Sequence, residues 1–407
     1  MEPNTFIPFH RPSIGLEEID EVIETLGSGW ITTGPRTHQF EHEFAAYVGA
    51  PHAIAVNSAT AGLHLALVAL GIKAGDEVIT TPNTFCSTVT TILHTGATPI
   101  LADIGNNGNI DPASIAERIT SKTRAIIPVH IAGLPCRMRE IWQLARRHNL
   151  FVIEDAAHAA GARYRNLPIG SMSGENHSDA CVFSFYATKN LTTGEGGMIT
   201  CSDPQLADRM KVLSLHGISK DAWQRYGEHG NWYYEVTAPG FKYNLSDLQS
   251  AIGIHQLHKL DSFIETRTQY AHYYNLEFSV MPELEVPPDA AGTRHAWHLY
   301  ILRLRPEALA INRDQFIAEL RARGIGVSVH FIPIPIHPYF AVLPSIRAHT
   351  YPRALTHYSR IVSIPLYPAM TESQLAAVVD AVKSVVHRNK RRSGVEPNVI
   401  AALCQEA

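Results

Sequence analysis

A lysine lies directly after a short apolar run, in the segment Ser184-Phe-Tyr-Ala-Thr-Lys189-Asn190. The run Cys181–Phe185 is typical of a buried strand, and α/β proteins bind ligands at the carboxyl ends of such strands. A lysine buried there loses its charge readily and can form a Schiff base. Most lysines just past a strand are simply solvated, so this segment alone does not establish a nucleophile.

An aspartate occupies the matching place one predicted strand earlier, in Val152-Ile-Glu-Asp155-Ala-Ala-His158. A carboxylate at that edge would keep a pyridine nitrogen protonated and make the ring an electron sink. The simpler interpretation is an aspartate that caps a helix, and His158 could equally be a packing residue. Asp155 therefore indicates a cofactor site only in combination with Lys189.

The segment Asn57–Gly62 opens a predicted helix that runs through Leu63–Leu70. Free backbone N–H groups at such an end, together with the helix dipole, favour a phosphate group. The hydroxyls of Thr60 and Ser184 could add donors. Taken alone, the segment is only a well-capped helix.

Phe85 follows the predicted strand Glu77–Thr80, where its ring could stack on a flat heterocycle, although a single Phe is by default a core residue. Asn244 adds a polar group in a glycine-containing loop. The helix start that could bind a phosphate, the stacking ring, the aspartate and the lysine follow one another along the chain, at strand ends of one predicted sheet. Pyridoxal phosphate needs these four functions together, so the sequence predicts a site for this cofactor.

Other cofactor motifs are missing from the sequence, which contains no GxGxxG, no GxxxxGK[ST] and no HExxH. His330 and His337, in a Pro-rich loop, could be read as metal ligands, but no third ligand is evident. A substrate-loop or packing role is the simpler interpretation, and we predict no metal site.

Short β-branched runs alternate with helical patterns in the first half of the chain. The predicted strands are Ala53–Val56, Glu77–Thr80, Pro99–Ala102, Ala125–Val129, Phe151–Glu154, Ala180–Phe185 and Gly197–Thr200. This alternation predicts a large α/β domain over residues 1–245, with a mostly parallel seven-stranded sheet between helices.

The pattern changes after Asn244. A long helix is predicted over Ser246–Ser279, followed by an extended segment Trp297–Leu304 and helices Arg313–Arg323 and Glu372–Val386. We therefore expect a smaller α+β domain over residues 246–387 and a basic, solvated tail over 388–407.

Composition narrows the class of protein further. The net charge of −4 gives no general attraction to nucleic acid or anionic membranes. Five cysteines without a CxxC pair indicate a reducing compartment, and neither a signal segment nor an apolar span is apparent. We expect a cytoplasmic protein that binds neither nucleic acid nor membranes.

At this point the sequence resembles the DegT/DnrJ/EryC1/StrS sugar aminotransferases, which have the fold of type I pyridoxal-phosphate enzymes. The resemblance covers nearly the whole chain, roughly Pro8 to Val386. The matching stretches are Gly29–Pro35, Ser58–Leu65, Gly75–Thr80, Glu154–His158, Ser184–Asn190, Glu195–Gly197, Pro239–Leu245, His295–Leu299, Arg323–Gly326 and Ile364–Pro368.

The resemblance implies a role for each candidate residue. Lys189 would carry pyridoxal phosphate as the internal aldimine, with pyridoxamine phosphate between the half-reactions, and Asp155 would bind the ring nitrogen. Phe85 would stack on the ring, with His158 beside its 3-hydroxyl group. The phosphate would be held by Ala59, Thr60 and Ser184, and by Asn244 from the neighbouring subunit of a homodimer.

The overall pattern is similar to enzymes that form 4-amino-4-deoxy-arabinose on a UDP carrier. It implies amino transfer, by analogy from glutamate, to a nucleotide-linked keto sugar at C4. Tyr186 departs from that pattern, because those enzymes carry His there, and the loop around His330 also differs. The residues expected to contact substrate are Trp30, Thr32, Tyr186, Arg225 and His330.

Other functions stay open on the sequence alone. The first is amination of a free cyclitol ketone of the inosose type. A sugar dehydratase on the same scaffold is a second, but such enzymes resemble the family with His where Lys189 stands. A non-catalytic member would be expected to have lost Lys189, Asp155 or Thr60, and all three are present.

Overall fold

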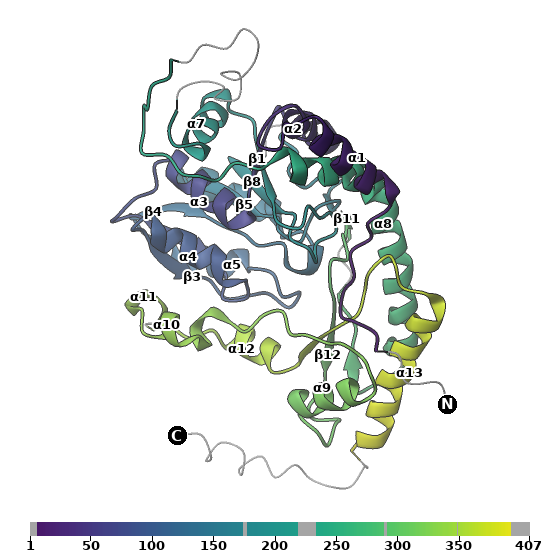
Figure 1. The fold of residues 1–407 in the computed structure, drawn as a ribbon. Coiled ribbons are helices and arrows are strands. Elements are labelled where there is room, and N and C mark those ends of the chain that lie inside the picture. Colours follow the sequence, from purple (N-terminus) through teal and green to yellow (C-terminus); the bar gives the residue numbers. More distant parts are fainter. Residues whose placement is uncertain (1–5, 174–176, 219–232, 289–290, 348, 392–407) are drawn as a thin grey trace.

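A seven-stranded sheet forms the centre of the larger part of the molecule (Figure 1). The computed structural model describes residues 6–173, 177–218, 233–288, 291–347 and 349–391. The strand order is β1-β9-β8-β5-β4-β2-β3, and β9 alone runs antiparallel to its neighbours. The strands are β1 (His52–Val56), β2 (Glu77–Thr80), β3 (Thr98–Leu101), β4 (Thr123–Ile126), β5 (Phe151–Asp155), β8 (Ala180–Ser184) and β9 (Gly197–Cys201).

All seven predicted strands are present, with small shifts at their ends. The largest shift is in β4, which begins at Thr123 and ends at Ile126, before the predicted end at Val129. Val129 forms an isolated bridge with Asp155 instead, so the chain leaves the sheet next to the end of β5. The mostly parallel α/β architecture is confirmed.

Helices cover both faces of this sheet, so its strands are buried on both sides. Along β8, Cys181 and Phe183 belong to the core beneath helices α2 and α8, whereas Val182 belongs to the core beneath α3 and α7. The helices of this part are α1 (Leu16–Gly27), α2 (Pro35–Val48), α3 (Ala59–Ala69), α4 (Cys86–His94), α5 (Pro112–Arg118), α6 (Met138–His148) and α7 (Pro204–Ser214).

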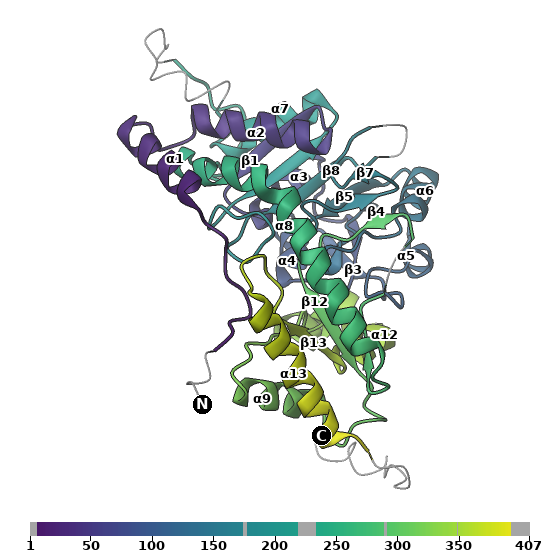
Figure 2. The same cartoon turned by 90° about the vertical axis from the view of Figure 1, so that its right-hand side faces the viewer.

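Helix α8 (Asp247–Ser279) joins the two parts of the molecule, and Figure 2 shows it running from the large sheet to the small one. It begins at a capping box in which Ser246 accepts from the backbone of Gln249, close to the predicted start. Its first half packs through Leu257 on the large core, and its second half packs through Tyr274 on the small core.

The smaller part is built on an antiparallel sheet of order β10-β12-β13. Its elements are β10 (Leu284–Glu285), β12 (Tyr300–Leu304), α9 (Arg313–Ala322), β13 (Ile361–Ile364) and α13 (Glu372–Asn389). The segment between α9 and β13 contains η3 (Ile334–Ile336), α10 (Pro338–Ala341), α11 (Pro344–Arg347) and α12 (Pro352–Tyr358). Short strands β6 (Arg163–Tyr164), β7 (Leu167–Pro168) and β11 (Thr293–Arg294) form a third sheet, and η1 (Ile131–Gly133) is a single turn.

The last helix is longer than the sequence indicates. It continues past Val386 to Asn389, and the Arg391 side chain donates to the carbonyl of Leu309. The start of the predicted tail is therefore held against the small part. None of the described helices has the length and apolarity needed to cross a bilayer.

Candidate active site

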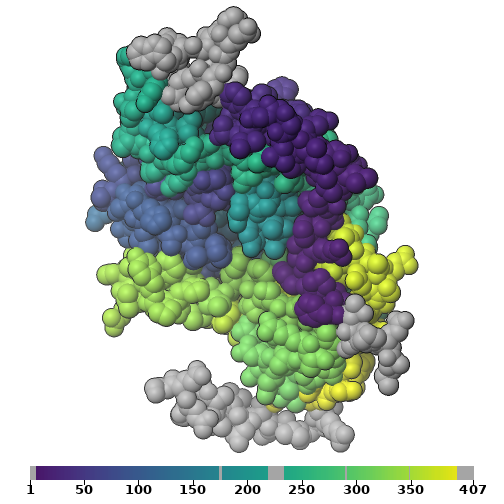
Figure 3. Space-filling model, in the orientation of Figure 1, coloured from purple at the N-terminus to yellow at the C-terminus, as the bar shows by residue number. Residues whose placement is uncertain are grey.

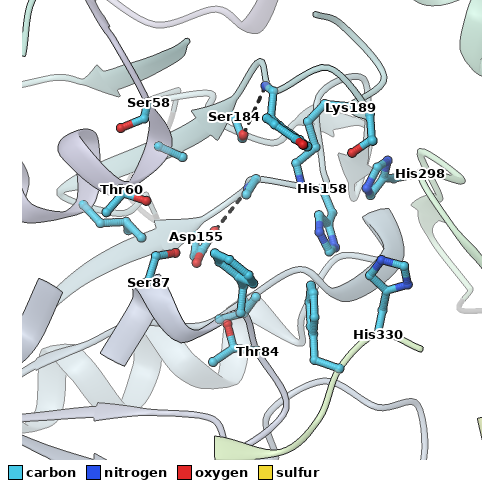
Figure 4. A pocket seen from close by; sticks show the side chains of 18 of the residues that line it. Ser58, Thr60, Thr84, Ser87, Asp155, His158, Ser184, Lys189, His298 and His330 are labelled. Carbon is cyan, nitrogen blue, oxygen red and sulfur yellow. Dashed lines mark hydrogen bonds between the residues drawn. The ribbon is translucent and has the colours of Figure 1, made fainter. Parts of the chain in front are cut away.

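A cavity of about 460 Å³ lies at the carboxyl ends of β5 and β8, and Figure 4 shows the side chains that line it. Its walls come from the amino-terminal ends of α3 and α4, the loops after β5 and β8, and segments near β12 and β13. The lining includes Ala59, Thr60, Phe85, Asp155, His158, Ser184, Tyr186, Lys189 and His330. Nine of the sequence-predicted residues thus meet in one cavity.

Lys189 and Asp155 meet because their strands are neighbours. β5 and β8 are parallel, and Asp155 pairs in register with Val182. Seven residues further on, Lys189 follows a turn in which its backbone N–H donates to the carbonyl of Tyr186 at 2.8 Å. Burial lowers the pKa of the Lys189 amine to about 8, against the opposing influence of the Asp155 charge.

Asp155 is only 4% exposed, and its two carboxylate oxygens are both hydrogen-bonded. Thr88 Oγ1 donates to Oδ2 at 2.8 Å, and the backbone N–H of Ala157 donates to Oδ1 at 3.2 Å. Burial raises the pKa of Asp155, while these donors and the charge of Lys189 act to lower it. The carboxylate is therefore fixed in orientation and faces a cavity that contains a cationic partner.

His158 is held as a neutral ring with a defined tautomer. The backbone N–H of Ala132 donates to its Nδ1 at 3.2 Å, so that nitrogen is an acceptor and the ring proton is on Nε2. Burial, followed by the charge of Lys189, lowers the pKa of His158 well below its usual value. Its ring also stacks on Phe331, with centroids 5.6 Å apart.

Helix α3 points its amino terminus at the cavity and lies unusually close to the sheet. The Ser58 hydroxyl accepts from the N–H of Ala61 at 3.1 Å, and the first N–H groups of a helix have no acceptor within it. A Cβ on Gly197 would lie 2.8 Å from the backbone nitrogen of Ala59, and one on Gly62 would lie 2.7 Å from a methyl of Val182. Two glycines thus allow this close approach.

Phe85 precedes α4 and keeps its ring at the cavity, with 58% of the residue exposed. The centroid of its ring lies 5.9 Å from that of Phe331. A ring exposed at a cavity wall is available to a flat ligand, unlike the core phenylalanine that composition alone would suggest.

Three of the predicted residues lie outside this cavity and close to one another. Asn244 Nδ2 donates to Thr33 Oγ1 at 2.7 Å, and Trp30 Nε1 donates to the carbonyl of Thr33 at 3.1 Å. The carbonyl of Thr32 accepts from the N–H of Asp247 at 3.1 Å. Arg225 lies outside the described residues.

Several lining residues were not identified from the sequence as site residues. They include Phe9, Thr84, Ser87, Glu195, His298 and Phe331. The stretch His295–Leu299 supported the family resemblance, but nothing in it gave His298 a position at the cavity. Among the described residues no group of three or more His, Cys, Asp and Glu side chains forms a metal-binding cluster.

The donor set fits pyridoxal phosphate. A lysine with a lowered pKa and a hydrogen-bonded carboxylate line one cavity, and a helix amino terminus offers N–H groups to an anion beside them. Together with the seven-stranded sheet, this site defines a pyridoxal-phosphate-dependent transferase of fold type I.

Comparison with known proteins gives the family. The sequence model of the DegT/DnrJ/EryC1/StrS aminotransferase family matches residues 12–383. The chain therefore belongs to this family. It is 50% identical over 385 residues to the spore coat polysaccharide biosynthesis protein SpsC of Bacillus subtilis, covering 94% of this chain and 98% of that protein.

Solved structures agree with this assignment. The putative sugar aminotransferase Spr1654 from Streptococcus pneumoniae, in its PMP-form, superposes with a TM-score of 0.86 at 31% identity, covering 94% of this chain and 99% of that one. DesV of S. venezuelae, in complex with a ketimine intermediate, gives 0.83 at 34% identity, covering 92% and 95%. The protein is a pyridoxal-phosphate-dependent sugar aminotransferase.

Proposed function

We propose that this enzyme transfers an amino group from L-glutamate to C4 of a nucleotide-linked keto sugar, with Lys189 and Asp155 at the reacting centre. The observation that carries the proposal is the meeting of these two side chains in one cavity beside the amino terminus of α3. The sugar as acceptor follows from the family. The nucleotide, the carbon and the donor rest on the sequence resemblance.

In this proposal each residue contacts one part of the cofactor. Lys189 would bind it covalently, Asp155 would hold the ring nitrogen, and Phe85 and His158 would flank the ring. Ala59, Thr60 and Ser184 would hold the phosphate. When bound, pyridoxal phosphate supplies an electron sink for the negative charge that develops at the substrate carbon.

Lys189 also moves the proton. Its Nζ atom, when free, would accept a proton from the carbon that bears the donor's amino group, and in the second half-reaction it would deliver one to the sugar carbon that receives the amino group. A pKa of about 8 suits this role better than the ordinary value of 10.5, because roughly a tenth of the amine is unprotonated at pH 7 instead of less than a thousandth. Asp155, whose carboxylate is fixed by Thr88 and Ala157, would hold the ring nitrogen of the cofactor.

The cavity, of about 460 Å³, is within the usual range for a small-molecule site. Tyr186 and His330 lie on its wall and are the residues we propose to contact the sugar. Arg225 remains our proposed contact for the diphosphate.

We further propose a homodimer whose sites lie at the interface. Trp30, Thr32 and Asn244 lie outside the cavity of their own chain, so they can contact substrate or phosphate only in a partner's site. Helix α1 carries exposed apolar residues at Leu16, Ile19, Ile23 and Leu26, which favours burial against a second copy. Figure 3 shows this amino-terminal region on the surface in purple.

Replacement of Lys189 tests the central assignment. Lys189→Ala should lose the visible absorption of the lysine-bound cofactor, and amination should fall by roughly 10²- to 10⁴-fold or more, because the covalent anchor and the proton carrier are both removed. Lys73→Ala, which replaces a lysine outside the cavity, is the control. Full turnover by Lys189→Ala would overturn the assignment.

A substrate screen separates the two acceptor classes. Keto-sugar nucleotides and a free inosose are each incubated with glutamate, and the products are analysed by mass spectrometry and NMR. We expect a new amine at C4 of a nucleotide-linked sugar. Amination of the inosose alone would favour the cyclitol alternative.

A further inference from the structure

A buried cation lies behind the cavity without a counter-ion. Arg267, on helix α8, is 1% exposed, and its Nη1 donates to the carbonyls of Trp297 at 3.2 Å, His298 at 3.4 Å and Leu366 at 2.6 Å. No ion pair with a carboxylate of the described chain is formed, and burial lowers its pKa to about 9. A buried guanidinium without a carboxylate is costly, so its presence next to the site calls for a function.

The carbonyls that Arg267 contacts belong to a strained turn. Trp297 has a φ of 47°, which is uncommon for a bulky residue. Its N–H donates to His295 Nδ1 at 2.8 Å, and the two rings stack with centroids 4.0 Å apart. Together these contacts hold the chain so that the next residue, His298, lies on the cavity wall.

His298 is linked to both the guanidinium and the cavity, because its carbonyl accepts from Arg267 Nη1 and its side chain lines the cavity. The residue is 5% exposed, and its Nδ1 is fully buried with no hydrogen-bond partner in the described part of the chain. Arg267 Nε is buried and unpartnered in the same way. Burial, and after it the charges of His158, Lys189 and Arg267, lower the pKa of His298 well below its usual value, so the ring is neutral.

That arrangement fixes which ring atom a ligand meets. Because Nδ1 is fully buried, Nε2 is the ring nitrogen left for a molecule in the cavity, and it can donate a hydrogen bond when the neutral ring carries its proton there. Figure 4 shows His298 beside Lys189 at the cavity wall. The side chain thus offers a hydrogen-bond donor backed by a positive charge.

We propose that His298, supported by Arg267, forms the subsite for a carboxylate group of the amino donor. The subsite rests on the proposed function, because it requires an amino-acid donor. In the described chain, Lys189 is the only lysine or arginine on the cavity wall, and it is engaged once the cofactor is bound. A carboxylate entering this cavity therefore needs another donor with positive charge behind it, which these two residues provide.

The donor half-reaction tests this subsite without the sugar. The change in visible absorption of the holoenzyme is followed at increasing glutamate concentration, and glutarate, which has no amino group, is titrated by calorimetry. His298→Ala should raise the apparent dissociation constants of both by on the order of 10- to 100-fold. The KM for the keto sugar should stay unchanged.

Arg267 variants separate charge from packing. Arg267→Met should weaken glutarate binding in the same direction, and Arg267→Lys, which keeps the charge, should weaken it less. Arg303→Met is the matched control, because Arg303 is also a buried arginine but pairs with Glu285 away from this cavity. It should leave glutarate binding unchanged.

The outcomes distinguish this subsite from the proposed function. If His298→Ala binds glutarate as tightly as the native enzyme, or if sugar and glutarate binding fall equally, the subsite is wrong. If the native enzyme binds glutarate through His298 but glutamate does not react, the proposed donor is wrong and the carboxylate subsite stands. His298→Ala keeps the test valid even if the Arg267 variants do not fold.

Discussion

At Lys189, burial and charge act in opposite directions on one amine. Burial favours the neutral form, whereas the carboxylate of Asp155 favours the ammonium form, and the resulting pKa is about 8. The amine is thus cationic enough to remain close to Asp155 and neutral often enough to react with a carbonyl group. Thr88 and Ala157, which hold Asp155, influence this balance indirectly.

We predict that the pH at which the cofactor-free enzyme captures pyridoxal phosphate depends on Asp155. Capture requires the neutral amine, so its rate should rise as the pH increases through about 8. Asp155→Asn removes the charge that stabilises the ammonium form, so the pKa of Lys189 falls and the midpoint moves to lower pH by on the order of one unit. The rise in visible absorption after mixing measures the rate.

Thr88→Val is the control for that shift. It removes a hydrogen bond to Asp155 but keeps the carboxylate charge, so the midpoint should move much less than in Asp155→Asn. An unchanged midpoint in Asp155→Asn would mean that the two groups are not electrostatically coupled.

At the scale of elements, the position of α3 depends on two residues that lack side chains. Gly197 in β9 and Gly62 in α3 lie where helix and sheet are in close contact, and a Cβ at Gly197 would meet three backbone atoms within 3.0 Å. Backbone cannot move aside as a flexible side chain does. The amino terminus of α3 is therefore set by its contact with the sheet as well as by its cap at Ser58.

Gly197→Ala should push α3 away from the sheet. We expect the free energy of unfolding to fall by about 1–3 kcal/mol, as for other overpacked sites, and the affinity for pyridoxal phosphate to fall on the order of tenfold. Denaturant melts and equilibrium cofactor titrations measure the two effects. Gly27→Ala is the control, since a Cβ there meets nothing within 4 Å.

Native cofactor affinity in Gly197→Ala would show that the α3 amino terminus does not hold the phosphate. A loss of stability without a loss of affinity would assign Gly197 to packing alone. The two measurements together therefore test, independently of turnover, whether the amino terminus of α3 binds the phosphate.

For the whole molecule, the distribution of exposed apolar residues bears on assembly. Leu16, Ile19, Ile23 and Leu26 recur along α1, at a spacing typical of one helix face, and Leu16 is 73% exposed. The same end of the molecule contains Trp30, Thr32 and Asn244, which a single chain leaves outside its cavity. A dimer that buries α1 would explain both observations.

Charges placed on α1 should disrupt this dimer. We expect the double variant Leu16→Glu/Ile23→Glu to sediment as a monomer and to retain less cofactor, because Asn244 would no longer reach the partner's site. Leu276→Glu, at an exposed apolar position on the second half of α8, should sediment like the native protein. Sedimentation velocity distinguishes these outcomes, and a dimeric double variant would place the interface on another surface.

The sequence by itself determined the elements and the residues at their ends. The seven strands and the capped start of α8 were predictable because apolar periodicity and capping are local properties of the chain. Lys189 and Asp155 could be identified for the same reason, since Asp155 ends one apolar strand and Lys189 comes five residues after the end of another. Their shared cofactor was predictable because few cofactors need that combination of groups.

Only the tertiary structure decided which distant residues complete the site. Thr88, Phe331, His298 and Arg267 come from separate elements, and no local pattern relates any of them to Lys189. The lowered pKa of Lys189 and the neutral form of His158 arise from burial, which depends on how the two parts of the chain pack around the cavity. Burial and long-range contacts are properties of the folded chain. The sequence therefore identifies the reactive side chains, whereas their pKa values and hydrogen-bond partners depend on the tertiary structure.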